Sequence, residues 1–170
     1  ADAANMLRSK LVELQQQYFI PRMHIVAHSA GGLVVRDFLR RYGEFHPYLN
    51  TFISLSTPWG GEPLAEFGVR HSPVVLPAWV DMQPASNFFA QLYRKPIPES
   101  VGHYLLFGYR GGVSLRANND GAVLVESLLD PRAQTGALEV RGFNESHLSI
   151  LNSAQAFAEV DRILQARDAT

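Results

Sequence analysis

The sequence predicts an α/β fold in which helices flank a mostly parallel sheet. Apolar side chains recur at helical spacing from Ala3 to about Tyr18. A short apolar run from Met23 to Ala27 follows, then a glycine-rich turn, then a second helical pattern from about Ala30 to Tyr42. A short buried strand placed between helices in this order is typical of a parallel sheet, because parallel strands need helical crossovers.

Three more apolar segments extend the same pattern. We expect strands from about Thr51 to Leu55, from Tyr104 to Phe107 and from Leu138 to Phe143. An amphipathic helix then closes the chain, and its predicted buried face carries Ile150, Ala154, Phe157, Val160 and Leu164. Residues 1–170 therefore form one predicted domain, with a sheet of four strands.

The segment from about 60 to 100 interrupts this regular order. It is rich in proline and large apolar residues, and Ser86 to Tyr93 within it could form a helix. A long insertion in a compact domain is usually a binding loop or a lid. Its aromatic residues and their neighbour, Trp59, Trp79, Phe88 and Phe89, could line or cover a substrate pocket, or simply pack in the core.

The composition excludes several classes of function. The net charge of -1 gives no reason to expect nucleic acid or an anionic membrane as a partner. With no cysteine, the chain has no thiol nucleophile and no disulfide. No apolar run is long enough to span a membrane, and the histidines lack metal-ligand spacing, so we expect no metal and no cofactor. None of this assigns a compartment.

Ser29 is the candidate nucleophile. It lies between a buried strand and a helix and is flanked by small residues, which a tight strand-to-helix turn requires. The N–H of Ala30, at the start of the helix, is a natural donor to a developing oxyanion. The alternative is that Ser29 only caps the helix.

Two further residues complete a possible catalytic set. Asp120 lies in a polar turn after a strand, and His147 lies just after the final strand. Separately, they could be an ordinary turn aspartate and a surface histidine. Together they give the order Ser, Asp, His, with each residue in a loop after a different strand. Asp81 and Asp130 are the alternative acids.

Four segments resemble lipases and the related GPI inositol-deacylase-like hydrolases of the α/β-hydrolase superfamily. Residues 27–32 (AHSAGG) resemble the nucleophile elbow, 119–123 (NDGAV) the acid turn and 146–148 (SHL) the histidine loop. Residues 56–61 (STPWGG) resemble the segment after the strand that follows the elbow. The four segments span nearly the whole chain in the order found in that family.

The resemblance implies a lipase or carboxylesterase that acts on a small-molecule or lipid ester. Ser29 would form an acyl-enzyme, His147 would act as the base, and Asp120 would orient His147. The same triad could instead transfer the acyl group to an alcohol, or the chain could be a non-catalytic relative.

The fold of that family has about eight strands, and four are predicted here. We therefore expect the chain to be the C-terminal catalytic part of the fold, without the N-terminal strands and the loop that supplies the second oxyanion donor. A partner chain or an N-terminal half would then cover the open edge of the elbow strand.

Overall fold

The computed structural model describes residues 2–61, 82–84, 86–111 and 118–169. Its centre is a sheet of four parallel strands in the order β1-β2-β3-β4. The strands are β1 (Met23–His28), β2 (Leu49–Leu55), β3 (Gly102–Gly108) and β4 (Ala137–Phe143). The predicted fold class is confirmed, and each strand extends slightly beyond its predicted bounds.

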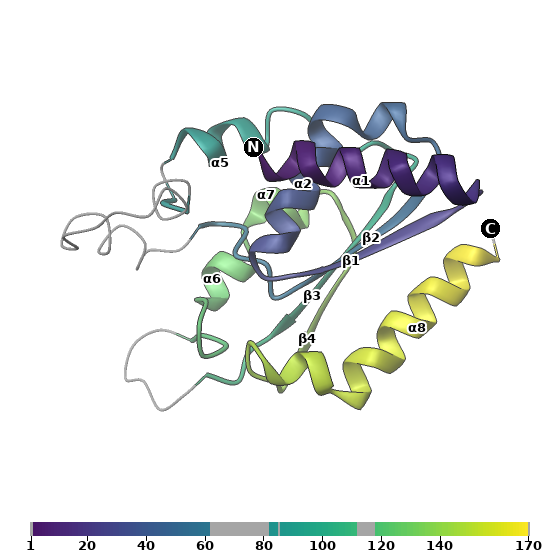
Figure 1. The fold of residues 1–170 in the computed structure, drawn as a ribbon. Coiled ribbons are helices and arrows are strands. Elements are labelled where there is room, and N and C mark those ends of the chain that lie inside the picture. Colours follow the sequence, from purple (N-terminus) through teal and green to yellow (C-terminus); the bar gives the residue numbers. More distant parts are fainter. Residues whose placement is uncertain (1, 62–81, 85, 112–117, 170) are drawn as a thin grey trace.

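Helices cover both faces of the sheet. The helices α1 (Ala3–Tyr18) and α2 (Ala30–Tyr42) pack together on one face, and α8 (Ala154–Asp168) runs along the other (Figure 1). The shorter helices are α5 (Asn87–Leu92), α6 (Val125–Leu128) and α7 (Pro131–Gln134), with the 3-10 turns η1 (Gly43–Phe45) and η2 (Ser149–Asn152). Within the described part of the chain, no helix is both long and apolar enough to cross a membrane.

The alternation of side chains along β2 divides the core in two. Phe52 points into the cluster under α1 and α2, where it packs with Phe38 and Leu105. Its neighbour Ile53 points into the cluster under α8, with Ile163. Because both faces are covered, β2 is buried along nearly its whole length.

The closing helix differs from the prediction in its start and its phase. Ile150 is buried as predicted, but it lies in η2, and Ser153 caps a new helix by accepting a hydrogen bond from the Ala156 N–H. This break rotates the helix, so that Ala156 faces the sheet and Phe157 is 53% exposed. The predicted placement of Ala154 and Phe157 on the buried face was therefore wrong, because both are exposed.

The strand β1 has an open edge. Among the described residues it pairs only with β2. The N–H groups of Met23 and Ser29 donate toward β2, to the carbonyls of Tyr48 and Leu55. Because main-chain direction alternates along a strand, the N–H of Val26 faces away from β2.

Candidate active site

Ser29 occupies a strained turn between β1 and α2. Its backbone has φ 55° and ψ -136°, a conformation that residues with a side chain rarely adopt. The Ser29 N–H donates to the Leu55 carbonyl at 2.9 Å, which fixes the turn to β2. Its side chain makes no capping hydrogen bond to α2. The helix-capping alternative therefore does not describe how this hydroxyl is used.

Small residues allow α2 to approach the sheet closely behind the turn. A Cβ atom on Gly32 would lie 2.0 Å from Thr57 Oγ1, so a side chain at this position would collide with the loop after β2. A Cβ atom on Gly31 would lie 3.8 Å from the Ala27 Cβ, which is an ordinary contact. Ala27 therefore leaves room for a methyl group at position 31, whereas Thr57 leaves none at position 32.

The structure brings Ser29, Asp120 and His147 together. The Ser29 Oγ lies 3.0 Å from His147 Nε2, and His147 Nδ1 lies 2.7 Å from Asp120 Oδ2. The three residues follow β1, β3 and β4, so all three lie at the C-terminal edge of the sheet. A main-chain bond of 2.7 Å from the His147 N–H to the Asp120 carbonyl joins the acid and histidine loops.

The environment of Asp120 keeps its carboxylate charged. Asp120 is fully buried, which by itself would raise its pKa. Hydrogen bonds from His147 and from the N–H groups of Val123 and Ala122 outweigh this effect, so the pKa lies below its usual value. Because one oxygen accepts the two N–H groups, the other is directed at His147.

His28 supports the histidine loop, which the sequence did not predict. Its Nε2–H donates to the His147 carbonyl at 2.8 Å, and the two imidazole rings lie 4.6 Å apart. Burial lowers the pKa of His28, so that its ring is neutral near pH 7. The position of His28 beside Ser29 was the only hint of this role in the sequence. Its partner, His147, is 119 residues away and could not be inferred from that position.

A polar network on the outer side also fixes this loop. Ser149 Oγ donates to Glu145 Oε2 at 2.5 Å, and it accepts the Ser146 N–H at 2.8 Å. Arg110 bonds both Glu145 and Ser149 through its guanidinium. Glu145 therefore holds the shape of the loop, whereas the ring nitrogens of His147 bond Asp120 and Ser29.

A cavity of about 680 Å³ begins beside the nucleophile turn. Apolar residues that include Ala30, Leu33, Val34, Met82 and Phe88 form one part of its wall. The rest of the wall is polar and consists of Asp2, Asp37, Arg40, Arg41, Asn87 and Gln91. The exposed N–H end of α2 at Ala30 lies in the same wall, and such first-turn N–H groups have no acceptor within the helix.

The four aromatic residues predicted near the substrate lie in different places. Phe88 lines the cavity beside Ala30, whereas Trp59 and Phe89 are buried in the core under α1 and α2. Trp79 and most of the predicted lid lie outside the described residues.

The alternative acids do not enter the site in the described part of the chain. Asp130 caps α7 and forms an ion pair with Arg132 at 2.7 Å. Asp81 lies outside the described residues. Those residues also contain no group of three acidic or histidine side chains that could hold a metal ion. What the geometry offers is a hydroxyl, an imidazole and a carboxylate in series, an arrangement that activates a serine for nucleophilic attack.

Comparisons with known proteins agree with this fold. The sequence profile of a family described as "Alpha/beta hydrolase of unknown function (DUF915)" matches residues 1–164. No curated protein matches the sequence.

Solved structures share the fold at low sequence identity. The mature lipase BlEst2 of Bacillus licheniformis has a TM-score of 0.73 and 23% identity, over 96% of this chain and 73% of that protein. The metagenomic carboxyl esterase MGS0156 has a TM-score of 0.67 and 19% identity, over 86% of this chain and 50% of that one. The product of gene lin2722 of Listeria innocua has a TM-score of 0.64 and 16% identity, over 94% of this chain and 64% of that one.

Proposed function

Because this chain belongs to the α/β-hydrolases of unknown function (DUF915), we propose that it is a serine hydrolase that cleaves carboxylic esters. The observation that carries the proposal is the series of hydrogen bonds from Asp120 through His147 to Ser29, at 2.7 and 3.0 Å. The names of two structural neighbours, a lipase and a carboxyl esterase, support the choice of an ester bond.

The first half of the reaction acylates Ser29. As Ser29 Oγ attacks the ester carbonyl, His147 Nε2 takes the hydroxyl proton. The buried Asp120 carboxylate stabilises the imidazolium that results and keeps its Nδ1–H directed at itself. The tetrahedral intermediate then collapses, the carbon–oxygen bond to the alcohol breaks, and His147 returns the proton to the leaving alkoxide.

The second half releases the acid. Water attacks the acyl-enzyme while His147 again accepts a proton, and the collapse of the second intermediate returns that proton to Ser29 Oγ. The Ala30 N–H stabilises the negative oxygen in both halves. Enzymes of this fold take a second donor from a loop after an earlier strand. No strand precedes β1 among the described residues, and lack of one donor costs about 100- to 1,000-fold in turnover.

The cavity beside Ala30 is the proposed site for the acyl group. Leu33, Val34, Met82 and Phe88 form an apolar part of its wall, on which a hydrocarbon chain can pack, whereas the charged residues of the cavity are already paired with one another. We therefore expect aliphatic esters to react faster than amides or charged esters.

A fluorophosphonate probe with detection by intact mass tests the nucleophile directly. The unmodified chain should gain one adduct, and Ser29→Ala should gain none. Asp120→Asn should fold but label about 1,000-fold more slowly or worse, because the wrong imidazole tautomer then faces Ser29. Ser9→Ala, which removes an exposed hydroxyl from α1, is the matched control and should label normally.

The outcomes separate the alternatives. An adduct that persists in Ser29→Ala, or no adduct in any variant, would contradict the proposed nucleophile. If labelling succeeds, p-nitrophenyl butyrate with and without glycerol identifies the acceptor. Butyrate as the main product supports hydrolysis, whereas butyryl glycerol as the main product would show acyl transfer instead.

A further inference from the structure

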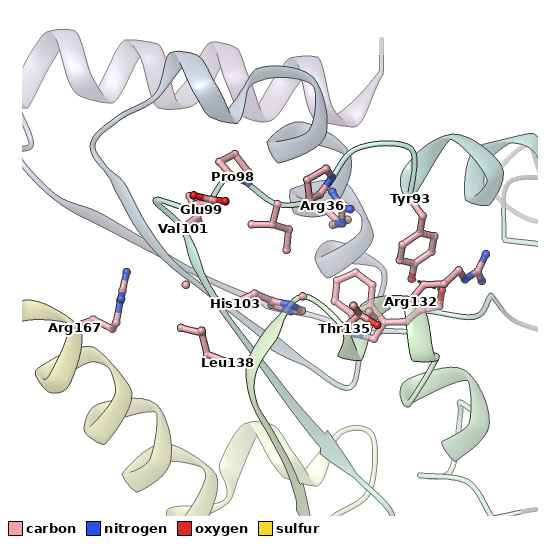
Figure 2. A pocket seen from close by; sticks show the side chains of 16 residues that line it. Arg36, Tyr93, Pro98, Glu99, Val101, His103, Arg132, Thr135, Leu138 and Arg167 are labelled. Carbon is pink, nitrogen blue, oxygen red and sulfur yellow. Dashed lines mark hydrogen bonds between the residues drawn. The ribbon is translucent and has the colours of Figure 1, made fainter.

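A second cavity lies away from Ser29, on the α2 side of the sheet. It has a volume of about 840 Å³, and its polar lining consists of one acidic side chain, Glu99, together with Arg36, Tyr93, His103, Arg132, Thr135 and Arg167 (Figure 2). Gly102 in its wall begins β3, at the end of the sheet opposite to the candidate triad. No part of the proposed hydrolysis uses this space.

Arg36 is the unusual residue of this cavity. Its side chain comes from α2 and is only 5% exposed. Its Nη2 donates to the Lys95 carbonyl at 2.6 Å, and its guanidinium lies 5.7 Å from the centre of the Tyr93 ring. Among the described residues, no ion pair includes Arg36, and its Nη1 has no hydrogen-bond partner.

Two more buried polar atoms in the same wall lack partners. They are the Nε1–H of Trp59 and Nδ1 of His103, and both side chains are 1% exposed. The two rings meet edge to face, with their centres 5.3 Å apart. Buried polar atoms are nearly always paired in folded proteins, so three unpaired atoms around one cavity point to a polar ligand.

The protonation of His103 defines what that ligand must offer. Burial lowers the pKa of His103 to about 3, so the ring is neutral. The Ser54 hydroxyl donates to the Tyr104 carbonyl at 3.3 Å, and it therefore accepts from His103 Nε2 at 3.1 Å. His103 Nδ1 is then an acceptor, whereas Arg36 and Trp59 offer donors.

A purely structural role for Arg36 explains only part of these contacts. The bond to Lys95 ties α2 to the chain before β3, which accounts for Nη2. It does not account for Nη1, and the nearby Asp37 carboxylate, which attracts the Arg36 charge, is already paired with Arg40 and Arg41. The other arginine beside Tyr93, Arg132, has its carboxylate partner in Asp130.

We propose that this cavity binds a small oxyanion that also carries a hydroxyl group. The anionic oxygens accept from Arg36 and Trp59, and the hydroxyl donates to His103 Nδ1. Hydrogen phosphate and 2-hydroxycarboxylates share this chemistry. All three unpaired atoms are covered, so the side chains of Arg36, Trp59 and His103 must all shift toward the cavity on binding, and side-chain rotamer changes of this kind are common at binding sites. The proposal is independent of the hydrolase activity.

Tryptophan fluorescence of the Trp79→Phe variant tests this proposal. The chain has two tryptophans, so Trp59 is the only one left in that variant. Phosphate, glycolate and acetate are titrated at constant ionic strength, with chloride as the balance. Phosphate and glycolate should give a saturable change in emission, and acetate, which lacks the hydroxyl, should need a higher concentration. The same titration of the Ser29→Ala chain should give the same result, which separates this site from the proposed nucleophile.

Arg36→Met in the same background should raise the half-saturating phosphate concentration at least about tenfold, because a charge-assisted bond is lost. The matched control is Arg94→Met, which removes an exposed arginine nearby and should leave binding unchanged. No saturable change with phosphate or glycolate would overturn the proposal, as would equal binding by folded Arg36→Met and Arg94→Met. If Arg36→Met does not fold, the phosphate titration of the Trp79→Phe chain decides alone.

Discussion

Ser29 combines an unfavourable backbone with a favourable set of neighbours. Its φ of 55° belongs to a conformation that costs about 1 to 3 kcal/mol for a residue with a side chain. Main-chain bonds on both sides hold it there, from the Ser29 N–H to Leu55 and from the Gly32 N–H to the Ser29 carbonyl. The strain lifts the hydroxyl out of the sheet toward His147, which an ordinary helix cap would not do.

His28 is a positioning residue for His147 under the proposed mechanism. Replacement with phenylalanine keeps a ring but removes the bond to the His147 carbonyl, so the loop is held less firmly. We expect His28→Phe to label with the fluorophosphonate about tenfold more slowly, since small errors in placement are costly in catalysis. The rate of labelling at saturating probe is the measurement.

Glutamine at position 28 is the matched control, because its amide nitrogen can donate at a similar reach. His28→Gln should recover most of the labelling rate. A purely steric role for the ring predicts the opposite order, with His28→Phe near the unmodified chain and His28→Gln impaired. That order would refute the positioning role.

At the scale of elements, the sequence predicted the helices and strands that a local residue pattern specifies. The apolar run of β2 and the periodicity of α1 and α2 depend on near neighbours, so their existence and type were predictable. The four-residue helices α6 and α7 are too short for a periodic pattern and were missed. The phase of α8 was wrong because Ser153 interrupts the pattern that leads into it.

The same distinction applies to the candidate site. Ser29 and His147 closely follow predicted strand ends, and Asp120 lies in a polar turn before a glycine, so the sequence could single them out. The bond from His28 to His147 and the cavity between Arg36 and His103 depend on which strands become neighbours. Those contacts join residues that are 67 or more positions apart, beyond the reach of any local pattern.

The contact between β2 and β3 makes the fold sensitive to acid. His103 on β3 bonds Ser54 on β2, and burial lowers its pKa from 6.5 to about 3. The unfolded chain therefore binds one more proton at this residue between pH 6.5 and pH 3, and stability falls as the pH falls through this range. The slope from His103 alone is up to about 1.4 kcal/mol per pH unit.

Urea unfolding at pH 6.5, 5.5 and 4.5 measures this slope. His103→Gln should be less stable than the unmodified chain at pH 6.5 but should lose stability less steeply down to pH 4.5. Some slope should remain, because burial also lowers the pKa of His28 and His46. Parallel curves for the two proteins would show that His103 is not the titrating group.

At the scale of the molecule, the main feature without a partner in the described part of the chain is the outer edge of β1. The main-chain groups of His24, Val26 and His28 face away from β2, and Val26 is 45% exposed. An open parallel strand at the edge of a sheet offers a template for another strand. We propose that a further segment or a partner chain pairs there when the hydrolase is fully assembled.

Hydrogen exchange of single amides tests the state of this edge in the 170-residue chain. The amides of Ile25 and Ala27, which point to β2, should exchange slowly, whereas the amide of Val26 should exchange at least about 100-fold faster. Size-exclusion chromatography over a range of concentrations should show self-association. A monomer at all concentrations with equal protection at positions 25 to 27 would contradict an open edge.

The position of the triad across the sheet has a consequence for the order of folding events. Ser29 follows β1 and His147 follows β4, at opposite edges of the sheet and 118 residues apart. Their hydrogen bond can close only after all three strand pairings have formed. During refolding from urea, the return of probe reactivity at Ser29 should therefore lag behind the recovery of helical signal and mark the last step of sheet assembly.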